Sequence, residues 1–240
     1  MGSICKKELQ QFFSNLTGYI AIILFLLVNG IFLFILKDSN LFDFGYATLQ
    51  SFFELAPWVL LFLVPAITMR SLSEEFRSGT FEMLQTRPLT KWQIVGGKYL
   101  AVLLVLLFVI LPTLLYVITI SRLSAANGID SGGITGSYVG LFLLAAVFAA
   151  IGLCCSSFTN NAVVAFLISA FACLVLYMGF NAISKLPVFM AGFDYYIEML
   201  GIDFHYKSVS RGRLDTRDVI YFASLVALFL IITVKNLLKR

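Results

Sequence analysis

Charged residues are scarce in this sequence of 240 residues, and histidine is almost missing. Only 12% of the residues are charged, one is a histidine, and cysteine and proline number four and five. A soluble domain carries about 25% charged residues, and a disordered chain needs high charge with few apolar residues. Four cysteines cannot build the dense disulfide framework of a small secreted domain. Soluble, disordered and disulfide-rich classes are therefore excluded.

The low share of charged residues is matched by a high share of apolar residues. They make up 60% of the chain, and the mean hydropathy is +0.95. This composition indicates an integral membrane protein, and the length fits one domain. The basic residues behind the net charge of +4 lie beside apolar runs. The charge therefore indicates membrane topology and contact with lipid rather than a surface for nucleic acid.

The scarcity of histidine and cysteine also limits the chemistry. His205 is the only histidine, and zinc sites usually take several nitrogen or sulfur ligands, so metal-dependent hydrolysis is disfavoured. We expect His205 to be an exposed loop residue. The cysteines lack the spacing of a redox or zinc pair, and we interpret them as small core residues. They are Cys5, Cys154, Cys155 and Cys173.

Six segments are long and apolar enough to cross a bilayer, which requires about 20 mostly apolar residues. The last of them has only 16 residues, and it fits if Asp218 and Lys235 lie at the two interfaces. The sequence therefore predicts an all-α membrane protein with one six-helix transmembrane domain over residues 1–240. The predicted spans are 19–36, 52–69, 99–120, 138–158, 162–181 and 219–234.

Lysine and arginine orient these segments. Both termini and the connection 70–98 are basic, which places them in the cytoplasm. The connection 182–218 is also basic, but it has to lie outside if both termini lie inside. Long loops follow the charge rule less closely, so we retain this orientation.

Three connecting segments have their own patterns. Residues 4–16 are amphipathic and predict an interfacial helix along the inner leaflet. Residues 121–137 are rich in Gly and Ser and predict a flexible outer loop. The apolar part of 182–218 contains three carboxylates, which would cost several kcal/mol in hydrocarbon. We therefore predict an external cap of short re-entrant helices there.

A few polar residues near the spans could carry chemistry. Glu54 lies about one turn inside the second span, at its outer end. It fits an interfacial group, and the alternative is an intramembrane polar site for a proton or a substrate. Asp215 and Asp218 could form an acid–base pair, but neighbouring Arg213 and Arg217 favour interfacial ion pairs.

The connection 70–98 contains most of the helix start and stop signals. Ser71 with Glu74 and Thr90 with Gln93 fit capping boxes at two helix starts. Gly79 interrupts the helix between them. A short isolated helix is left at about 80–86.

This short helix needs a partner surface. A helix under about 12 residues is marginal alone, yet this one presents Phe81 and Leu84 on one face, with Glu82 and Arg87 flanking them. The two apolar side chains pack either against another subunit or against the ends of the protein's own spans.

The residues of this loop resemble a known family. EEFRSGTFEMLQTRPLTKWQIVGGKYLA is similar to the loop of ABC-2 type transporter permeases, with an acidic pair, Gly-Thr, Glu-x-Leu, Pro and Ile-Val-x-x-Lys. KKELQQFFSNLTGYI, SSFTNNAVVAF and SVSRGRLDTRDVIYFASL agree as well, so the resemblance covers nearly the whole chain. It looks closest to the permease associated with bacterial gliding motility. Asn161 departs from the pattern, which has Lys, Glu or Gln there.

The resemblance implies a permease with no catalytic residues and no cofactor of its own. In such permeases the short helix is a cytoplasmic coupling helix, held in a cleft of a separate subunit that binds ATP and Mg²⁺. Also implied are a second permease subunit, either a copy or a relative, a passage lined by the second and fifth spans, and the bacterial inner membrane. The positions carried over as ATPase contacts are Phe76, Gly79, Thr80, Phe81, Glu82, Leu84 and Arg87.

Competing functions fit the sequence less well. The GGK at 96–98 resembles the end of a phosphate-binding loop, but Tyr99 replaces the required Ser or Thr and Trp92 replaces the first Gly. An EExxxR protease motif at 74–79 fails because Gly79 stands in the Arg position. The remaining alternative is a membrane anchor that assembles an ATPase without moving a substrate.

Overall fold

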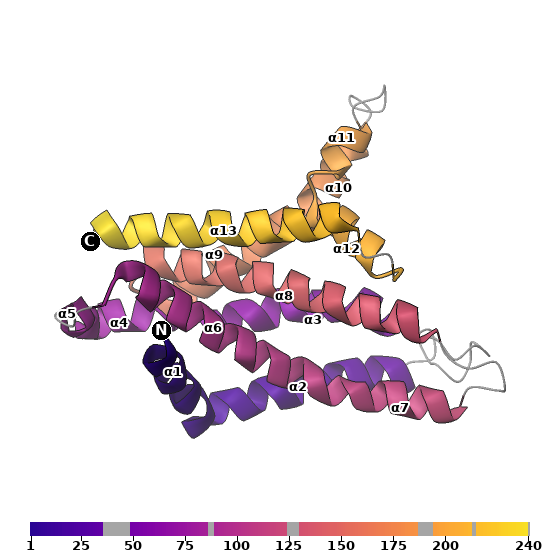
Figure 1. The fold of residues 1–240 in the computed structure, drawn as a ribbon, viewed down its shortest axis with the longest axis horizontal. Helices are drawn as coiled ribbons and strands as arrows, with labels where there is room; N and C mark the ends of the chain where they lie inside the picture. The colour runs from indigo at the N-terminus through magenta and orange to yellow at the C-terminus, as the bar shows by residue number, and fades with distance from the viewer. Residues whose placement is uncertain (36–48, 86–88, 124–129, 187–193, 213–214, 240) are drawn as a thin grey trace.

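The computed structural model describes residues 1–35, 49–85, 89–123, 130–186, 194–212 and 215–239, and its regular elements within these ranges are helices (Figure 1). The main helices of the candidate spans are α2 (Leu16–Phe34), α3 (Gln50–Thr68), α6 (Lys91–Ile110), α8 (Ser131–Phe158), α9 (Ala162–Leu174) and α13 (Thr216–Lys239). The remaining elements are α1 (Gly2–Ser14), α4 (Ser73–Ser78), α5 (Thr80–Gln85), the 3₁₀ turn η1 (Leu111–Thr113), α7 (Leu114–Leu123), the π-helical η2 (Val175–Gly179), α10 (Phe180–Ser184), α11 (Asp194–Glu198) and α12 (Ile202–Val209).

Five helical segments are long and apolar enough to cross a membrane, and a sixth results if α1 and α2, which meet at a bend of 69°, count as one. The all-helical prediction with about six spans is therefore confirmed at this level. The five segments are Gln50–Ser78, Lys91–Arg122, Ser131–Phe158, Ala162–Ser184 and Thr216–Lys239. Several extend well beyond the predicted spans because polar residues at their ends continue the helix.

The prediction of a flexible loop over 121–137 is wrong for the part that the structure describes. α7 continues to Leu123 and α8 begins at Ser131, with Asp130 as its N-cap, while residues 124–129 lie outside the described ranges. The glycines of this stretch allow close packing. A Cβ on Gly136 would come within 2.9 Å of the Cα of Gly212 in the turn after α12. Glycine here marks a close helix contact rather than a loop.

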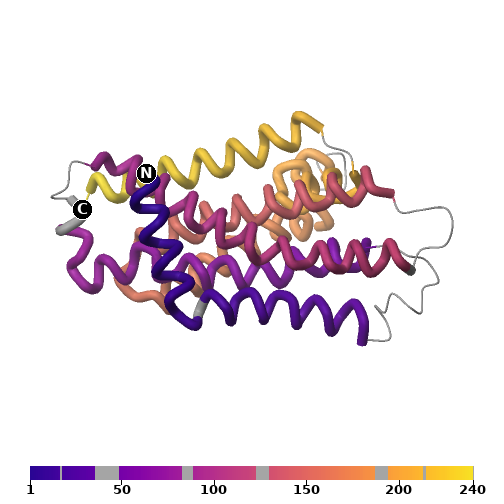
Figure 2. Tube along the Cα trace, turned by 60° about the horizontal axis from the view of Figure 1, so that its bottom comes forward, coloured from indigo at the N-terminus to yellow at the C-terminus, as the bar shows by residue number. Residues whose placement is uncertain are grey.

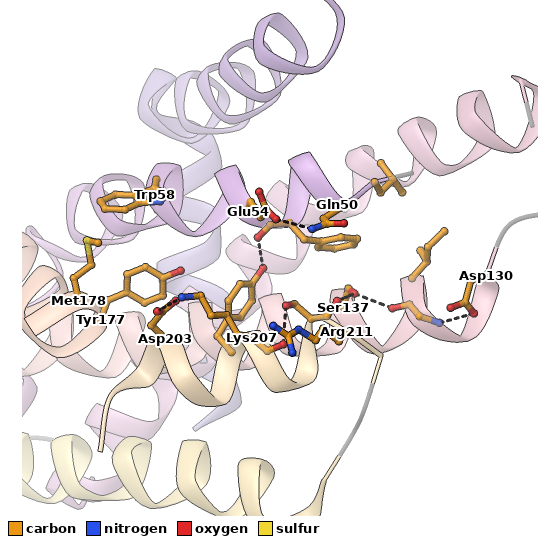
Figure 3. Close-up of a pocket in the computed structure, with 16 residues that line it drawn as sticks. Gln50, Glu54, Trp58, Asp130, Ser137, Tyr177, Met178, Asp203, Lys207 and Arg211 are labelled. Carbon is orange, nitrogen blue, oxygen red and sulfur yellow. Dashed lines mark hydrogen bonds and ion pairs between the residues drawn. The ribbon is translucent and has the colours of Figure 1, made fainter. Parts of the chain in front are cut away.

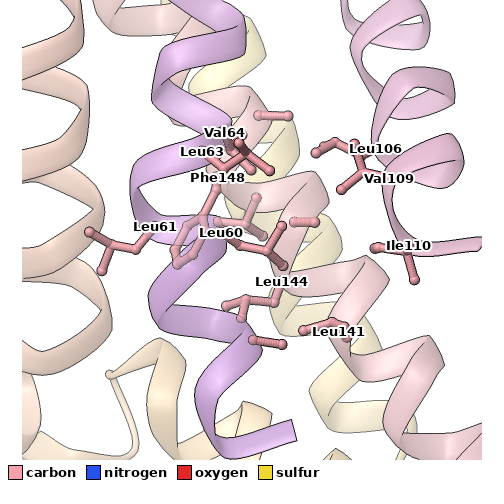
Figure 4. Close-up of a cluster of buried hydrophobic side chains, with 14 of the residues drawn as sticks. Leu60, Leu61, Leu63, Val64, Leu106, Val109, Ile110, Leu141, Leu144 and Phe148 are labelled. Atoms are coloured by element: carbon pink, nitrogen blue, oxygen red, sulfur yellow. The ribbon is translucent and has the colours of Figure 1, made fainter. Parts of the chain in front are cut away.

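The core lies around α8. Of its most apolar window 83% is buried, against 22% for α13, so α8 is the central helix. Leu60 of α3 and Phe148 of α8 are fully buried, and Leu106 of α6 joins them (Figure 4). Three of the four cysteines are buried as predicted, and Cys5 is half-buried. At Gly152 a Cβ would overlap the side chain of Thr68, so α3 and α8 pack very closely.

The molecule has two distinct ends (Figures 1 and 2). Both termini lie beside α4 and α5, at what we call the terminal end. The end of α7, the start of α8 and α12 lie at the opposite end, which we call the far end. Because both termini lie at the same end, the chain passes along the bundle an even number of times, which agrees with six membrane spans. Which end faces the cytoplasm stays a prediction.

α1 packs on the first half of α6. Ile4 is buried there, and a Cβ on Gly97 would come within 3.0 Å of its Cβ. The GGK at 96–98 therefore lies inside a helix and provides a seat for α1, a role different from that of a phosphate-binding loop. Residues 4–16 are largely helical as predicted, and their placement at a membrane surface stays a prediction.

Candidate functional site

The terminal end is built around a sharp break between two short helices. α3 leads through a turn into α4, and Gly79 ends α4 with φ of 70°, a left-handed conformation that glycine adopts at low cost. The break predicted at Gly79 is present. The predicted capping box of Ser71 and Glu74 does not form, because the α4 N-cap is Leu72. α5 follows directly after the glycine.

Phe81 fixes α5 to its own protein. Its side chain is 5% exposed and packs with Val95 of α6 and with Val234 and Leu237 of α13. The ring of Phe76 meets it edge-on, with ring centroids 4.9 Å apart. Of the two surfaces that the sequence left open for Phe81, the ends of the protein's own spans are therefore in contact with it.

Lys98 forms the second connection at this end. The side chain is 1% exposed, and Nζ lies 2.7 Å from Glu8 Oε1 and 2.8 Å from Glu75 Oε1. It also donates to the carbonyl oxygen of Ser71 at 2.8 Å. The cluster thus joins α1, the α3–α4 turn, α4 and α6.

This cluster has one cation for two carboxylates. In their charged forms, Lys98, Glu8 and Glu75 sum to −1, and Glu75 Oε2 is buried with no hydrogen-bond partner among the described residues. A buried pair of this kind is costly to break, since removing one member leaves an uncompensated charge. The two halves of the loop 70–98 are therefore held in a fixed relation.

Polar contacts extend the same block to α8 and α13. Ser156 Oγ accepts hydrogen bonds from the backbone N–H groups of Leu72 and Ser73, at 3.0 and 3.1 Å, and so satisfies donors at the start of α4. Asn236 of α13 donates to the Ser157 carbonyl at 2.7 Å. A displacement of α4 or α5 would therefore also displace the helices that contact this block, α6, α8 and α13.

The far end contains a cavity of about 760 Å³ between α3, α12, the start of α8 and η2 (Figure 3). Glu54 lines it from α3, and its Oε1 accepts a hydrogen bond from Gln50 Nε2 at 2.9 Å. Trp58 follows one turn later on the same face, and Tyr177 of η2 lies beside it. Glu54 therefore faces a space large enough for a small molecule.

α12 forms one wall of this cavity. Tyr206 donates to the Phe53 carbonyl at 2.6 Å, and burial raises the pKa of its hydroxyl well above the usual value. Asp203 is paired with Lys207 at 2.6 Å and accepts from Asn181 at 3.2 Å. The cap predicted over 182–218 does contain short helices, and one of them lines a cavity.

Comparison with known protein families covers residues at both the terminal end and the far end. A model described as an ABC-2 family transporter protein matches residues 45–198, more than half of the chain. The chain belongs to the ABC-2 transporter family. No curated protein matches it. As a member of this family it is a membrane permease component, and the matched residues include Gly79, Lys98 and Glu54.

The ABC-2 permease presents only part of the predicted ATPase contact set on its surface. Thr80 and Glu82 are exposed, and Thr80 Oγ1 lies 2.9 Å from Ser78 Oγ. Phe76 is half-buried against Phe81. The side chain of Leu84 and the whole of Arg87 lie outside the described residues.

The prediction that His205 is an exposed loop residue is wrong. It lies on α12 with 4% exposure, its Nδ1 is 2.6 Å from Asp218 Oδ1, and its Nε2 is 2.9 Å from the Met199 carbonyl. The ring stacks on Tyr221 with centroids 3.9 Å apart. α12 places His205 against α13, and the residues around His205 in the sequence do not indicate this contact.

The pairing predicted for the neighbouring acids in the permease also needs correction. Asp218 pairs with His205 instead of an arginine. Asp215 Oδ1 accepts the backbone N–H of Arg217 at 3.1 Å at the start of α13. Arg213 lies outside the described residues.

The sequence did not reveal Lys98 as a structural cation of the ABC-2 permease, because its pattern indicated only membrane orientation, the family loop and a rejected phosphate-binding loop. The signal was present, since the acidic pair and this lysine are both parts of the loop pattern. Ser156 and Glu8 gave no such signal. Their partners lie more than 80 positions away in the chain.

Proposed function

We propose that this ABC-2 permease couples ATP hydrolysis in a separate ATP-binding subunit to the movement of a substrate, with α5 as the contact for that subunit. The observation that carries the proposal is the way α5 is held. Its exposed residues Thr80 and Glu82 project from a helix whose buried Phe81 is fixed between α6 and α13. The partner would bind ATP and Mg²⁺.

The proposed transmission follows the contacts at the terminal end. A push on α5 acts on α6 and α13 through Phe81, and on α3 through the Gly79 break and α4. The Lys98 cluster makes α1 and α6 move with α4. Packed interiors have low compressibility, so such a displacement is passed on rather than absorbed.

The finer assignments are also proposals. A second permease subunit, either a copy or a relative, would complete the membrane part, and α3 and the α9–η2 span would line the passage. The location would be the bacterial inner membrane with both termini in the cytoplasm. A role in gliding motility or a related secretion process is supported by the sequence resemblance alone.

A charge reversal at the surface of α5 tests the coupling contact. We expect Glu82→Arg to reduce the co-purified ATP-binding subunit, and the ATP hydrolysis per permease, several-fold, because Glu82 is exposed on the proposed contact. The tagged permease would be purified from its native membranes, with its membrane level measured in parallel. Lys185→Glu, an exposed reversal after α10, is the matched control.

Full retention of the ATP-binding subunit by Glu82→Arg would contradict the proposal. If the subunit is retained by the wild type but no transported substrate stimulates its ATP hydrolysis, the protein acts as an anchor that assembles the ATPase. The same preparation therefore separates the two functions.

A further inference from the structure

The far-end cavity has an aromatic end and a polar end. Figure 3 shows Trp58, Tyr177 and Met178 at one side and Asp130 at the other, with Arg211 between them. The rings of Trp58 and Tyr177 have centroids 6.0 Å apart and stand at 83° to each other. The two rings meet edge to face, with Trp58 38% exposed and Tyr177 5% exposed, and we call this pair the aromatic corner. An indole face of this kind attracts ammonium groups.

Glu54 stands next to this corner. It lies four residues before Trp58 on α3, so both side chains are on one face of the helix. Glu54 is exposed and lines the cavity. It accepts a hydrogen bond from the neutral amide of Gln50, and it takes part in no ion pair within the described residues. Its charge is therefore left for a ligand to balance.

The other charges of the cavity are accounted for elsewhere. Lys207 is 2.6 Å from Asp203, so this cation and this carboxylate balance each other. Asp130 accepts the Gly133 N–H at the start of α8, where a helix favours negative charge. Arg211 is exposed and lies in the middle of the cavity, between Lys207 and Asp130 (Figure 3). In their charged forms the three carboxylates and two cations that line the cavity therefore sum to −1.

The backbone at the corner is also unusual. Tyr177 and Met178 belong to η2, a π-helical segment of five residues between α9 and α10. Such segments are rare and occur often at functional sites, because the wider turn re-aims the side chains it carries. Here the wider turn puts Tyr177 beside Trp58.

We propose that Trp58, Tyr177 and Glu54 bind the ammonium group of an organic cation. The ring faces and the carboxylate both attract positive charge, and a cavity of about 760 Å³ has room for an apolar body attached to it. This rests on the proposed transport function in naming its substrate class. The binding itself is measured on the purified permease without any ATPase, so either idea can fail alone.

The chain contains its own reporter for this site. It has two tryptophans, and Trp92 lies at the start of α6, at the terminal end, so Trp92→Phe leaves Trp58 as the sole tryptophan. We expect benzyltrimethylammonium to change the Trp58 fluorescence in a saturable way, and benzoate, an anion of similar size, to leave it unchanged. Trp58→Phe with Trp92 retained is the silent control. An equal response to both ions would overturn the proposal.

Variants then assign the contacts. In the same background, Glu54→Gln should weaken binding of the cation roughly tenfold, whereas Tyr177→Phe, which keeps the ring, should not. Unchanged affinity in Glu54→Gln would overturn the role of the carboxylate. The cation-versus-anion comparison needs no change at the site, so it decides the proposal even if a variant fails to fold. If glycerophosphocholine competes with benzyltrimethylammonium, the natural source of the ammonium group is a lipid headgroup. If it does not compete, the natural ligand is a free organic cation.

Discussion

Lys98 is a buried cation on which three separate segments depend. Its ammonium is surrounded by two carboxylates and a carbonyl oxygen, and the side chain itself is 1% exposed. Taking such groups out of water is costly, and the cost is recovered only while every partner is present. The cluster is thus a fixed point between α1, α4 and α6, and its members should act as one unit.

We therefore expect Lys98→Met to destabilise the protein by about 3–5 kcal/mol, because it leaves Glu8 and Glu75 without their cation. Denaturant unfolding in detergent, followed by tryptophan fluorescence, measures this. Adding Glu8→Gln and Glu75→Gln to Lys98→Met removes the uncompensated charge and should recover much of the loss. Wild-type stability in Lys98→Met alone would show that the cluster contributes nothing.

At the scale of elements, α5 shows how a helix too short to persist alone is kept. It has six residues, fewer than an isolated helix needs in water. Its order comes from tertiary contacts, chiefly the seating of Phe81 against Val95, Val234 and Leu237. The helix is therefore rigid toward its own protein while it presents Glu82 outward.

Phe81→Ala should release α5 from the helix ends. Removing a buried phenylalanine costs about 3–5 kcal/mol in a core, more than a six-residue helix can supply by itself. Hydrogen–deuterium exchange of residues 80–85 should become faster, while the exchange of α8 stays slow. Glu82→Ala, which changes an exposed side chain on the same helix, should keep the protection. Unaltered exchange in Phe81→Ala would mean that other contacts hold α5.

The whole molecule separates its two kinds of site along its length. The charged cluster and α5 lie at the terminal end, and the aromatic cavity lies at the far end, with α3 running between them (Figures 1 and 3). This separation fits the proposed function, in which an ATP-binding subunit acts on the terminal end and a ligand binds at the far end. The proposed function requires the terminal end to face the cytoplasm.

Cysteine labelling tests that orientation. With the four native cysteines replaced, a single cysteine at Arg211, at the far end, should react with a membrane-impermeant maleimide in intact spheroplasts. A cysteine at Ser78, next to α5, should react only after permeabilisation, because the positive-inside rule places the loop 70–98 in the cytoplasm. Reaction of Ser78→Cys in intact spheroplasts would reverse the assignment.

The sequence by itself determined the membrane class, the approximate positions of the spans and the break at Gly79. These depend on composition and on the local conformational preferences of a few neighbouring residues, which a linear reading contains. The Thr90–Gln93 capping box was likewise predictable and is present, because both partners lie within one helical turn.

Only the tertiary structure decided which side chains meet across the bundle. Lys98 and Glu8 are 90 positions apart, Tyr206 and Phe53 are 153 apart, and the burial of His205 depends on how α12 lies on α13. Such contacts arise from helix packing, and packing is fixed by shape complementarity between faces that no local pattern specifies. The buried cation and the cavity beside Glu54 exist for that reason, as does the surface that Phe81 contacts.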